Sequence, residues 1–141
     1  DMAAFTARTE ETLANLMKQR TVLNVRRKRR RALYTALADA EALAPVKELY
    51  EAGLSGMETE FAQYMDAVAA LEQCGVPREG LIQEKAELYD RLAELNRQIR
   101  AERRKLALCR KTQNSLPRME QEIDKAEARE SEVRTNEHRR R

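Results

Sequence analysis

The sequence predicts an all-α fold, in which long antiparallel helices form a helical hairpin or a coiled-coil-like bundle. Gly (4) and Pro (3) are scarce among the 141 residues, and the abundant residues Ala, Leu, Glu, Arg and Lys are good helix formers. Aromatic residues make up 4% and charged residues 36%, with no Trp, which suits thin seams between helices better than a thick globular core. Residues with β-branched side chains never alternate over the length of a strand, so we expect no sheet.

The first predicted helix covers about Thr9 to Leu43, with Thr9 as its N-cap. Pro45 removes a backbone donor and disfavours helix at the residue before it, so a break or kink is expected there. A short helix over Val46–Ala52 follows, and Gly53–Gly56 forms the turn that ends it.

The second helix is predicted to begin with a capping box formed by Ser55 and Glu58. Apolar residues then follow at helical spacing: Met57, Phe61, Tyr64, Met65, Val68 and Leu71. Gly75–Gly80 is a short connection, which makes the next helix antiparallel to this one.

The third helix is the longest and covers about Leu81 to Asn114. Its apolar residues are spaced four and three apart, as in a heptad seam: Leu88, Leu92, Leu95, Ile99, Leu106 and Cys109. Lys85, Glu102 and Gln113 weaken this seam, so its partner is either another helix of the chain or a modest homodimer. The first four of these apolar residues are the predicted helix interface.

Asn114–Pro117 is expected to break or kink that helix, and the following segment is a charged helical or disordered tail. The predicted organisation therefore has three parts. Residues 1–52 hold the long helix with a basic run, residues 53–114 form a helical hairpin, and residues 115–141 are the tail.

The net charge of +3 conceals a strong segregation of charge along the chain. Eight basic and no acidic residues lie between Lys18 and Arg31, whereas eight acidic residues and one basic residue lie between Asp39 and Glu72. A second basic stretch runs from Arg97 to Lys111. Basic blocks of this kind usually meet a polyanion, although the acidic stretch could instead fold back on them.

Six consecutive cations form what we call the basic hexad: Arg26, Arg27, Lys28, Arg29, Arg30 and Arg31. Six successive residues go around more than one helical turn, so some of these cations must lie on the seam marked by Leu23, Leu33 and Leu37. Either phosphates or the acidic stretch would relieve the repulsion between them. We interpret the hexad as a nucleic-acid-binding site, aided by a second set of cations: Arg97, Arg100, Arg103, Arg104 and Lys105.

Residue sets for catalysis are missing from the sequence, so we expect no enzymatic activity, metal or cofactor in this chain. His138 is the one histidine and lies in the polar tail, where we expect it to be exposed to solvent. The sequence contains neither GxxxxGK[ST] nor GxGxxG. Tyr34, Tyr64 and Tyr89 are expected to pack in the core, although Tyr34 directly follows the hexad and could stack on a base.

Six segments of the chain, from residue 49 onward, resemble the C-terminal helical region of relaxases from conjugative and mobilisable elements of Firmicutes-type bacteria. The segments that carry this resemblance are Leu49–Glu58, Phe61–Tyr64, Glu84–Tyr89, Leu92–Asn96, Leu106–Lys111 and Asn136–Arg141. The metal-binding histidines and the DNA-joining tyrosine of those enzymes are missing here. The resemblance therefore implies a detached, non-catalytic module of a DNA mobilisation protein.

Such a module would contact the DNA backbone beside the nick site, or bring relaxosome and secretion-channel proteins together. The alternative is a coiled-coil structural or protein-interaction module that does not bind nucleic acid. We expect two reduced thiols at Cys74 and Cys109, no membrane partner and a cytoplasmic location.

Overall fold

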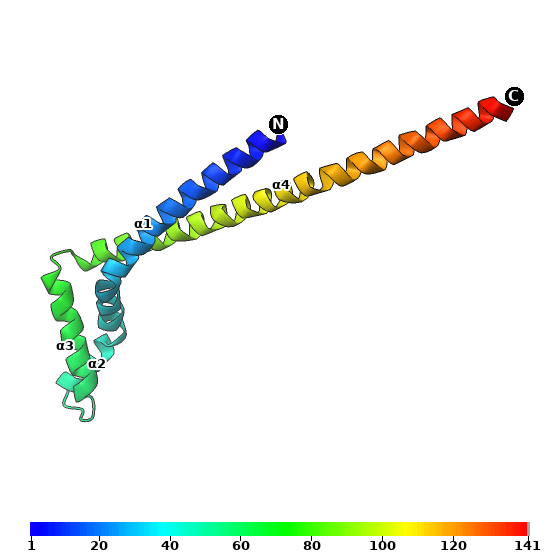
Figure 1. Cartoon of the computed structure of the whole chain (residues 1–141). Coiled ribbons are helices and arrows are strands. Elements are labelled where there is room, and N and C mark those ends of the chain that lie inside the picture. The colour runs from blue at the N-terminus through cyan, green and yellow to red at the C-terminus, as the bar shows by residue number, and fades with distance from the viewer. Residues whose placement is uncertain (141) are drawn as a thin grey trace. The chain divides into compact units, whose positions relative to one another are not determined.

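A computed structural model of the chain shows four α-helices and no strand over residues 1–140, which confirms the predicted all-α class (Figure 1). The helices are α1 (Met2–Ala42), α2 (Ala44–Glu51), α3 (Glu58–Gln73) and α4 (Arg78–Arg140). The structure describes the backbone of residues 1–140 and the side chains of residues 1–136. The predictions for His138 and for the basic ending of the tail lie outside the described side chains.

The chain divides into two compact units, which are described separately below. Unit 1 consists of Asp1–Leu16 and Gln98–Arg141, and unit 2 consists of Met17–Arg97. Within residues 1–140, no helix combines the length and the apolar character needed to cross a bilayer. Cys74 in unit 2 and Cys109 in unit 1 are both free thiols.

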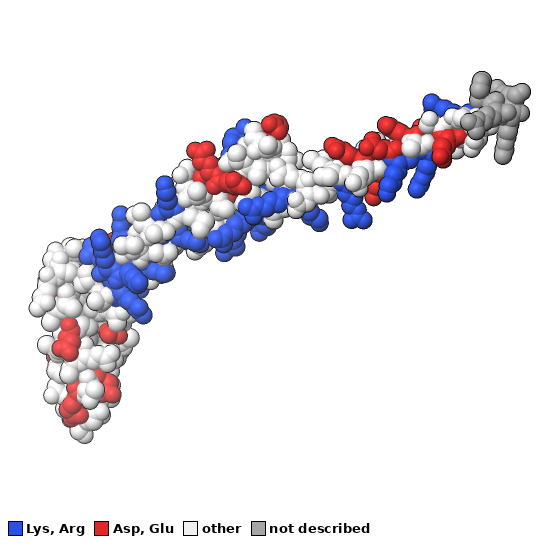
Figure 2. Space-filling model, in the orientation of Figure 1, with Lys and Arg blue, Asp and Glu red and all other residues white. Residues whose placement is uncertain are grey.

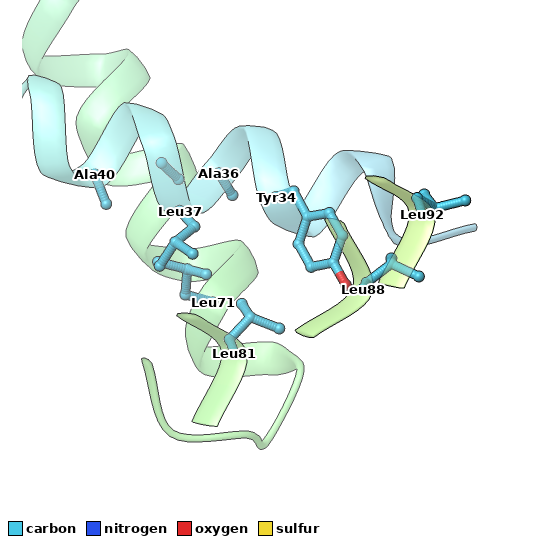
Figure 3. Packing of buried hydrophobic residues seen from close by; sticks show 9 residues of the cluster. Tyr34, Ala36, Leu37, Ala40, Leu71, Leu81, Leu88 and Leu92 are labelled. Carbon is cyan, nitrogen blue, oxygen red and sulfur yellow. The ribbon is translucent and has the colours of Figure 1, made fainter. Parts of the chain in front are cut away.

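The core of unit 2 lies where α1, α3 and α4 meet, and Figure 3 shows Leu37, Leu71 and Leu81 side by side there. Leu88 and Leu92 of the predicted seam belong to the same cluster, and Leu95 is fully buried. In unit 1, Ile99 is buried as well. The four residues of the predicted helix interface are therefore covered by helices of the same chain. Burial of each leucine contributes about 1.5–3 kcal/mol to stability.

In unit 2, α1 and α4 are antiparallel. Arg20 Nη1 donates a hydrogen bond to Asn96 Oδ1 at 3.1 Å, and Arg30 Nη2 lies 2.9 Å from Glu84 Oε1. Residue numbers thus rise along α1 as they fall along α4. The prediction that α4 returns antiparallel to α3 after Gly75–Gly80 is wrong, because these two helices meet at a steep angle (Figure 1). Helix α2 packs on α3, where the rings of Tyr50 and Phe61 stack with their centroids 4.0 Å apart.

The prediction that Thr9 caps the first helix is wrong, because α1 begins at Met2. The carboxylate of Asp1 accepts a hydrogen bond from the amide of Ala3 at 3.1 Å, which is the bond that an N-cap makes. Thr9 is buried inside the helix, and its hydroxyl donates to the carbonyl of Phe5 at 2.9 Å. The preceding helical turn therefore supplies the hydrogen-bond partner of this hydroxyl, and Thr9 makes no capping bond.

The predicted break at Pro45 is confirmed, since α1 ends at Ala42 and α2 begins at Ala44. Pro45 lies in the first turn of α2, where its missing amide hydrogen costs no intrahelical bond. Gly53 then has a φ of 92°, a left-handed conformation that ends the helix and that other residues rarely adopt.

The predicted capping box is wrong, because the N-cap of α3 is Met57 and not Ser55. Gly56 between them has a φ of 87°, and this left-handed residue turns the chain before the helix starts. The carboxylate of Glu58 accepts a hydrogen bond from the amide of Gly56 at 3.3 Å. Glu58 thus satisfies a donor in the turn, and Ser55 has no part in the cap.

The prediction of a break at Asn114–Pro117 is also wrong, because Pro117 lies inside α4. A proline within a helix removes one hydrogen bond and costs about 3 kcal/mol. The residues that follow it, Arg118 to Ala128, are mostly good helix formers, so the helix resumes its hydrogen bonding at once. Ser115 adds a bond from its hydroxyl to the carbonyl of Thr112 at 2.9 Å.

Candidate nucleic-acid interface

The basic hexad lies in the middle of α1, in unit 2, and one of its members faces α4. Arg30 is spaced seven residues from both Leu23 and Leu37, so it falls on the packed face of the helix. Its Nε and Nη2 atoms lie 3.0 and 2.9 Å from Glu84 Oε1. This confirms the prediction that a cation of the hexad lies on the packed face of α1, and Arg30 is that cation.

The other five cations of the hexad are exposed. Within the described side chains, the ion pair of the hexad is the one with Glu84, which lies outside the acidic stretch Asp39–Glu72. Figure 2 shows basic side chains gathered over the middle of α1, with acidic side chains over α2 and α3. The acidic stretch therefore does not neutralise the hexad.

Three of these exposed cations, Arg27, Lys28 and Arg31, line an open groove in unit 2 with a volume of about 800 Å³. We call it the basic groove. The lining residues of α1 share one face of the helix, because they recur three and four residues apart: Thr21, Asn24, Lys28, Arg31, Thr35 and Ala38. Lys85 on α4 adds a fourth cation, and no carboxylate lines the groove.

Two tyrosine rings complete the lining of the groove. Tyr34 and Tyr89 have ring centroids 6.5 Å apart and planes tilted by 48°. Lys85 Nζ lies 5.8 Å from the centroid of Tyr34 and 5.9 Å from that of Tyr89, within the range of a cation–π interaction. The groove therefore presents a cation and an aromatic ring next to one another.

Tyr34 is buried, as predicted, but the prediction that Tyr89 packs in the core is wrong. The side chain of Tyr89 is 42% exposed, because it projects beside the seam and not into it. Lys85 and Tyr89 are the site residues that sequence reasoning missed. Their spacing of four residues places them on one face of α4 and could have identified them as neighbours.

The hydroxyl of Tyr34, which lines the groove, and one carboxylate oxygen of Glu84 (Oε2) are buried and have no hydrogen-bond partner among the described residues. Burial raises the pKa of Tyr34 above its ordinary value, and the nearby charge of Glu84 raises the pKa further. Tyr34 is therefore neutral at physiological pH and keeps its hydroxyl hydrogen.

The second predicted set of cations belongs mainly to unit 1. Arg100, Arg103 and Arg104 are exposed on α4, while Lys105 pairs with Glu102 at 3.1 Å. Arg97 in unit 2 forms an ion pair with Glu94. The structure thus gathers Arg27, Lys28 and Arg31 into one groove, whereas Arg100, Arg103 and Arg104 lie on the other unit.

Comparisons with protein-family models, with curated proteins and with solved structures found no match to this chain. Among the described residues, no group of three or more His, Cys, Asp or Glu side chains is arranged to hold a metal ion. The basic groove offers four cations to a negatively charged group and the exposed ring of Tyr89 to a flat apolar group.

Proposed function

We propose that this chain is a helical binding module that holds the phosphate backbone of DNA in the basic groove of unit 2. One observation carries the proposal. Arg27, Lys28, Arg31 and Lys85 surround a single open groove that no carboxylate lines. Exposed cations without an internal counter-charge repel one another, and bound phosphates relieve this repulsion while releasing counterions from the DNA.

The hexad supports the proposal through the way in which its members differ. Arg30 is used inside the protein, where Glu84 pairs with it and fixes the rotation of α1. That rotation directs Lys28 and Arg31 into the groove, since they lie three residues apart on the face that also carries Asn24 and Thr35. The internal ion pair therefore orients cations that remain free for a ligand.

The exposed ring of Tyr89 favours single strands over duplex DNA. Proteins that bind single strands combine a positively charged groove with aromatic side chains on which unpaired bases stack. A duplex keeps its bases stacked on one another and offers only its phosphates to such a groove. Both strand types should bind through their phosphates, and a single strand should gain the additional contact with Tyr89.

The setting of this activity is DNA mobilisation, in which the chain would serve as the non-catalytic C-terminal region of a relaxase. The resemblance of six sequence segments to that region supports this setting. DNA held beside a nick site needs affinity for the backbone with little sequence preference, and phosphate contacts supply this kind of binding.

A salt titration of DNA binding tests the proposal. Fluorescence anisotropy would measure the affinity of a labelled single strand for the wild type and for the groove variant Arg27→Gln, Lys28→Gln, Arg31→Gln. Each phosphate contact with a single strand contributes about 0.7 to the slope of log affinity against log salt, so the variant should lose about two units of slope. Circular dichroism would show that its helices remain intact.

A matched control separates the groove from general electrostatics. The variant Lys18→Gln, Arg26→Gln, Arg29→Gln loses the same charge from exposed positions of α1 that do not line the groove. It should keep most of the affinity and most of the slope. Equal losses in the two variants, or no binding by the wild type at low salt, would reject the basic groove as the site.

A further inference from the structure

The second half of α4 carries apolar side chains that are exposed. In unit 1 the seam of α4 is buried as far as Cys109, and Thr112 is half-buried. Helix α4 continues well past Thr112 (Figure 1). From there the large apolar residues are 41–56% exposed: Leu116, Met119, Ile123 and Val133.

These exposed residues continue a face that is already used for packing. Leu116 follows the buried Cys109 by seven residues, which is about two helical turns on the same face. Met119, Ile123 and Ala126 follow Leu116 in steps of three, four and three, and Val133 comes seven residues after Ala126. This is the heptad spacing of a coiled coil, with Leu116 and Ile123 at one core position and Met119, Ala126 and Val133 at the other. We call this set of residues the exposed stripe.

The charges that flank the exposed stripe are divided between its two ends. In the heptad set by Leu116, the flanking positions of the first half carry Glu120, Glu122 and Glu127. The flanking positions of the second half carry Arg129 and Arg134. All five side chains are exposed. One end of the stripe is therefore flanked by negative charge and the other end by positive charge.

We propose that the exposed stripe binds the same stripe of a second copy of this chain, in antiparallel orientation. With Leu116 opposite Val133 and Ile123 opposite Ala126, the flanking positions bring Glu120 next to Arg134 of the other copy. The same register brings Glu122 next to Arg129 of the other copy. Two-fold symmetry repeats each pair, so four attractive pairs flank the dimer, against one repulsive pair between Glu127 and Glu127 of the other copy at the symmetry axis.

A parallel dimer is disfavoured by the same residues. In a parallel coiled coil the flanking pairs join residues five apart in sequence, which would bring Glu122 against Glu127 and Arg129 against Arg134. Each of these pairs joins like charges. The charge pattern thus selects a second copy in the antiparallel orientation, and this interface uses none of the residues that line the basic groove.

Sedimentation from micromolar to millimolar concentration tests the proposal on the full 141-residue chain. The wild type should associate reversibly into dimers. Two variants should each become monomeric or raise the dissociation constant by at least about tenfold, because four attractive pairs become repulsive. The first is Glu120→Arg, Glu122→Arg, and the second is Arg129→Glu, Arg134→Glu.

Mixing these two variants provides the decisive control. In the mixed dimer each of the four pairs again joins an arginine to a glutamate, so association should recover to about the wild-type strength. Recovery also shows that both variants are folded. A wild type that stays monomeric over the whole concentration range overturns the proposal and leaves the stripe for another protein. Variants that associate like the wild type overturn it as well.

Disulfide trapping tests the orientation. Leu116→Cys mixed with Val133→Cys should give covalent dimers under mild oxidation, because these two positions face one another in the antiparallel register. Each variant alone should trap no more than the wild type, whose native cysteines set the background, since identical positions then lie roughly 25 Å apart. Efficient trapping of Leu116→Cys with itself would indicate a parallel dimer and would overturn the proposal.

Discussion

Arg30 and Glu84 join α1 to α4 through an ion pair of 2.9 Å in which both side chains are about one-third exposed. One glutamate oxygen accepts a hydrogen bond from Nε and lies 2.9 Å from Nη2, while the other oxygen is buried without a hydrogen-bond partner among the described residues. The pair contributes to stability, but its position matters more for the groove. It sets which cations of the hexad face the core and which face the basic groove.

A double-mutant cycle measures this pair. Arg30→Met and Glu84→Met should each lower the free energy of unfolding by about 1 kcal/mol, because each leaves a partly buried charge without its partner. The double variant should be less destabilised than the sum of the two single variants, with a coupling energy of about 0.5–1 kcal/mol. Urea unfolding followed by circular dichroism gives all four values. Additive effects would show that the pair has no net interaction.

Removal of the buried hydroxyl of Tyr34 should stabilise the protein. The Tyr34→Phe variant keeps the ring in the core and eliminates a polar group that has no hydrogen-bond partner among the described residues, which gains about 1 kcal/mol. Tyr64→Phe is the matched control, because that buried tyrosine is not among the residues with an unpartnered hydroxyl. Thermal unfolding at neutral pH compares the two variants, and equal melting temperatures for Tyr34→Phe and the wild type would contradict the prediction.

The raised pKa of Tyr34 also predicts how stability depends on pH. The folded protein holds the phenol proton more tightly than the unfolded chain, whose tyrosine has a pKa of about 10. The contribution of Tyr34 is therefore fully present below pH 10 and is lost as the pH rises through its folded pKa. Unfolding measured across the alkaline range should show a steeper loss for the wild type than for Tyr34→Phe. Parallel curves would contradict this.

The exposed ring of Tyr89 supports a prediction about strand type. Tyr89→Ala should weaken binding of single-stranded DNA by about 1–3 kcal/mol, because it removes the stacking surface, and should leave duplex binding nearly unchanged. Tyr89→Phe keeps the ring and should bind both strand types like the wild type. Anisotropy titrations at a single salt concentration give the comparison. Equal losses for single strands and duplex would assign Tyr89 a structural role only.

The sequence was sufficient to predict the packed face of each long helix. The spacing of Leu88, Leu92 and Leu95 identifies the side of α4 that packs within the chain. The spacing of Leu23 and Leu37 implies that a cation lies between them on the seam. These predictions hold because helical periodicity is a local property that each segment carries by itself.

The basic groove could be predicted only in part, because its second wall depends on the register between two helices. Lys85 and Tyr89 lie beside the hexad only when Arg30 is opposite Glu84. The sequence of either helix alone does not determine this alignment of α1 with α4. The helix ends were missed for a different reason. Gly56 turns the chain immediately before α3, and the hydroxyl of Thr9 bonds inside α1, whereas Thr9 and Ser55 both satisfy the sequence rules for an N-cap.

Glu130 provides a last prediction, because it occupies a core position of the exposed stripe. In the antiparallel register it lies opposite Met119 of the other copy, where a carboxylate must lose water against an apolar side chain. Glu130→Leu should therefore lower the dissociation constant of the dimer by at least about tenfold. The two-fold symmetry repeats the substitution, so two layers of the dimer become apolar. Glu132→Leu removes the same charge and adds the same side chain away from the stripe, so it should leave the dimer unchanged. Sedimentation of both variants gives the comparison, and equal association in the two would show that general hydrophobicity, and not this register, drives the contact.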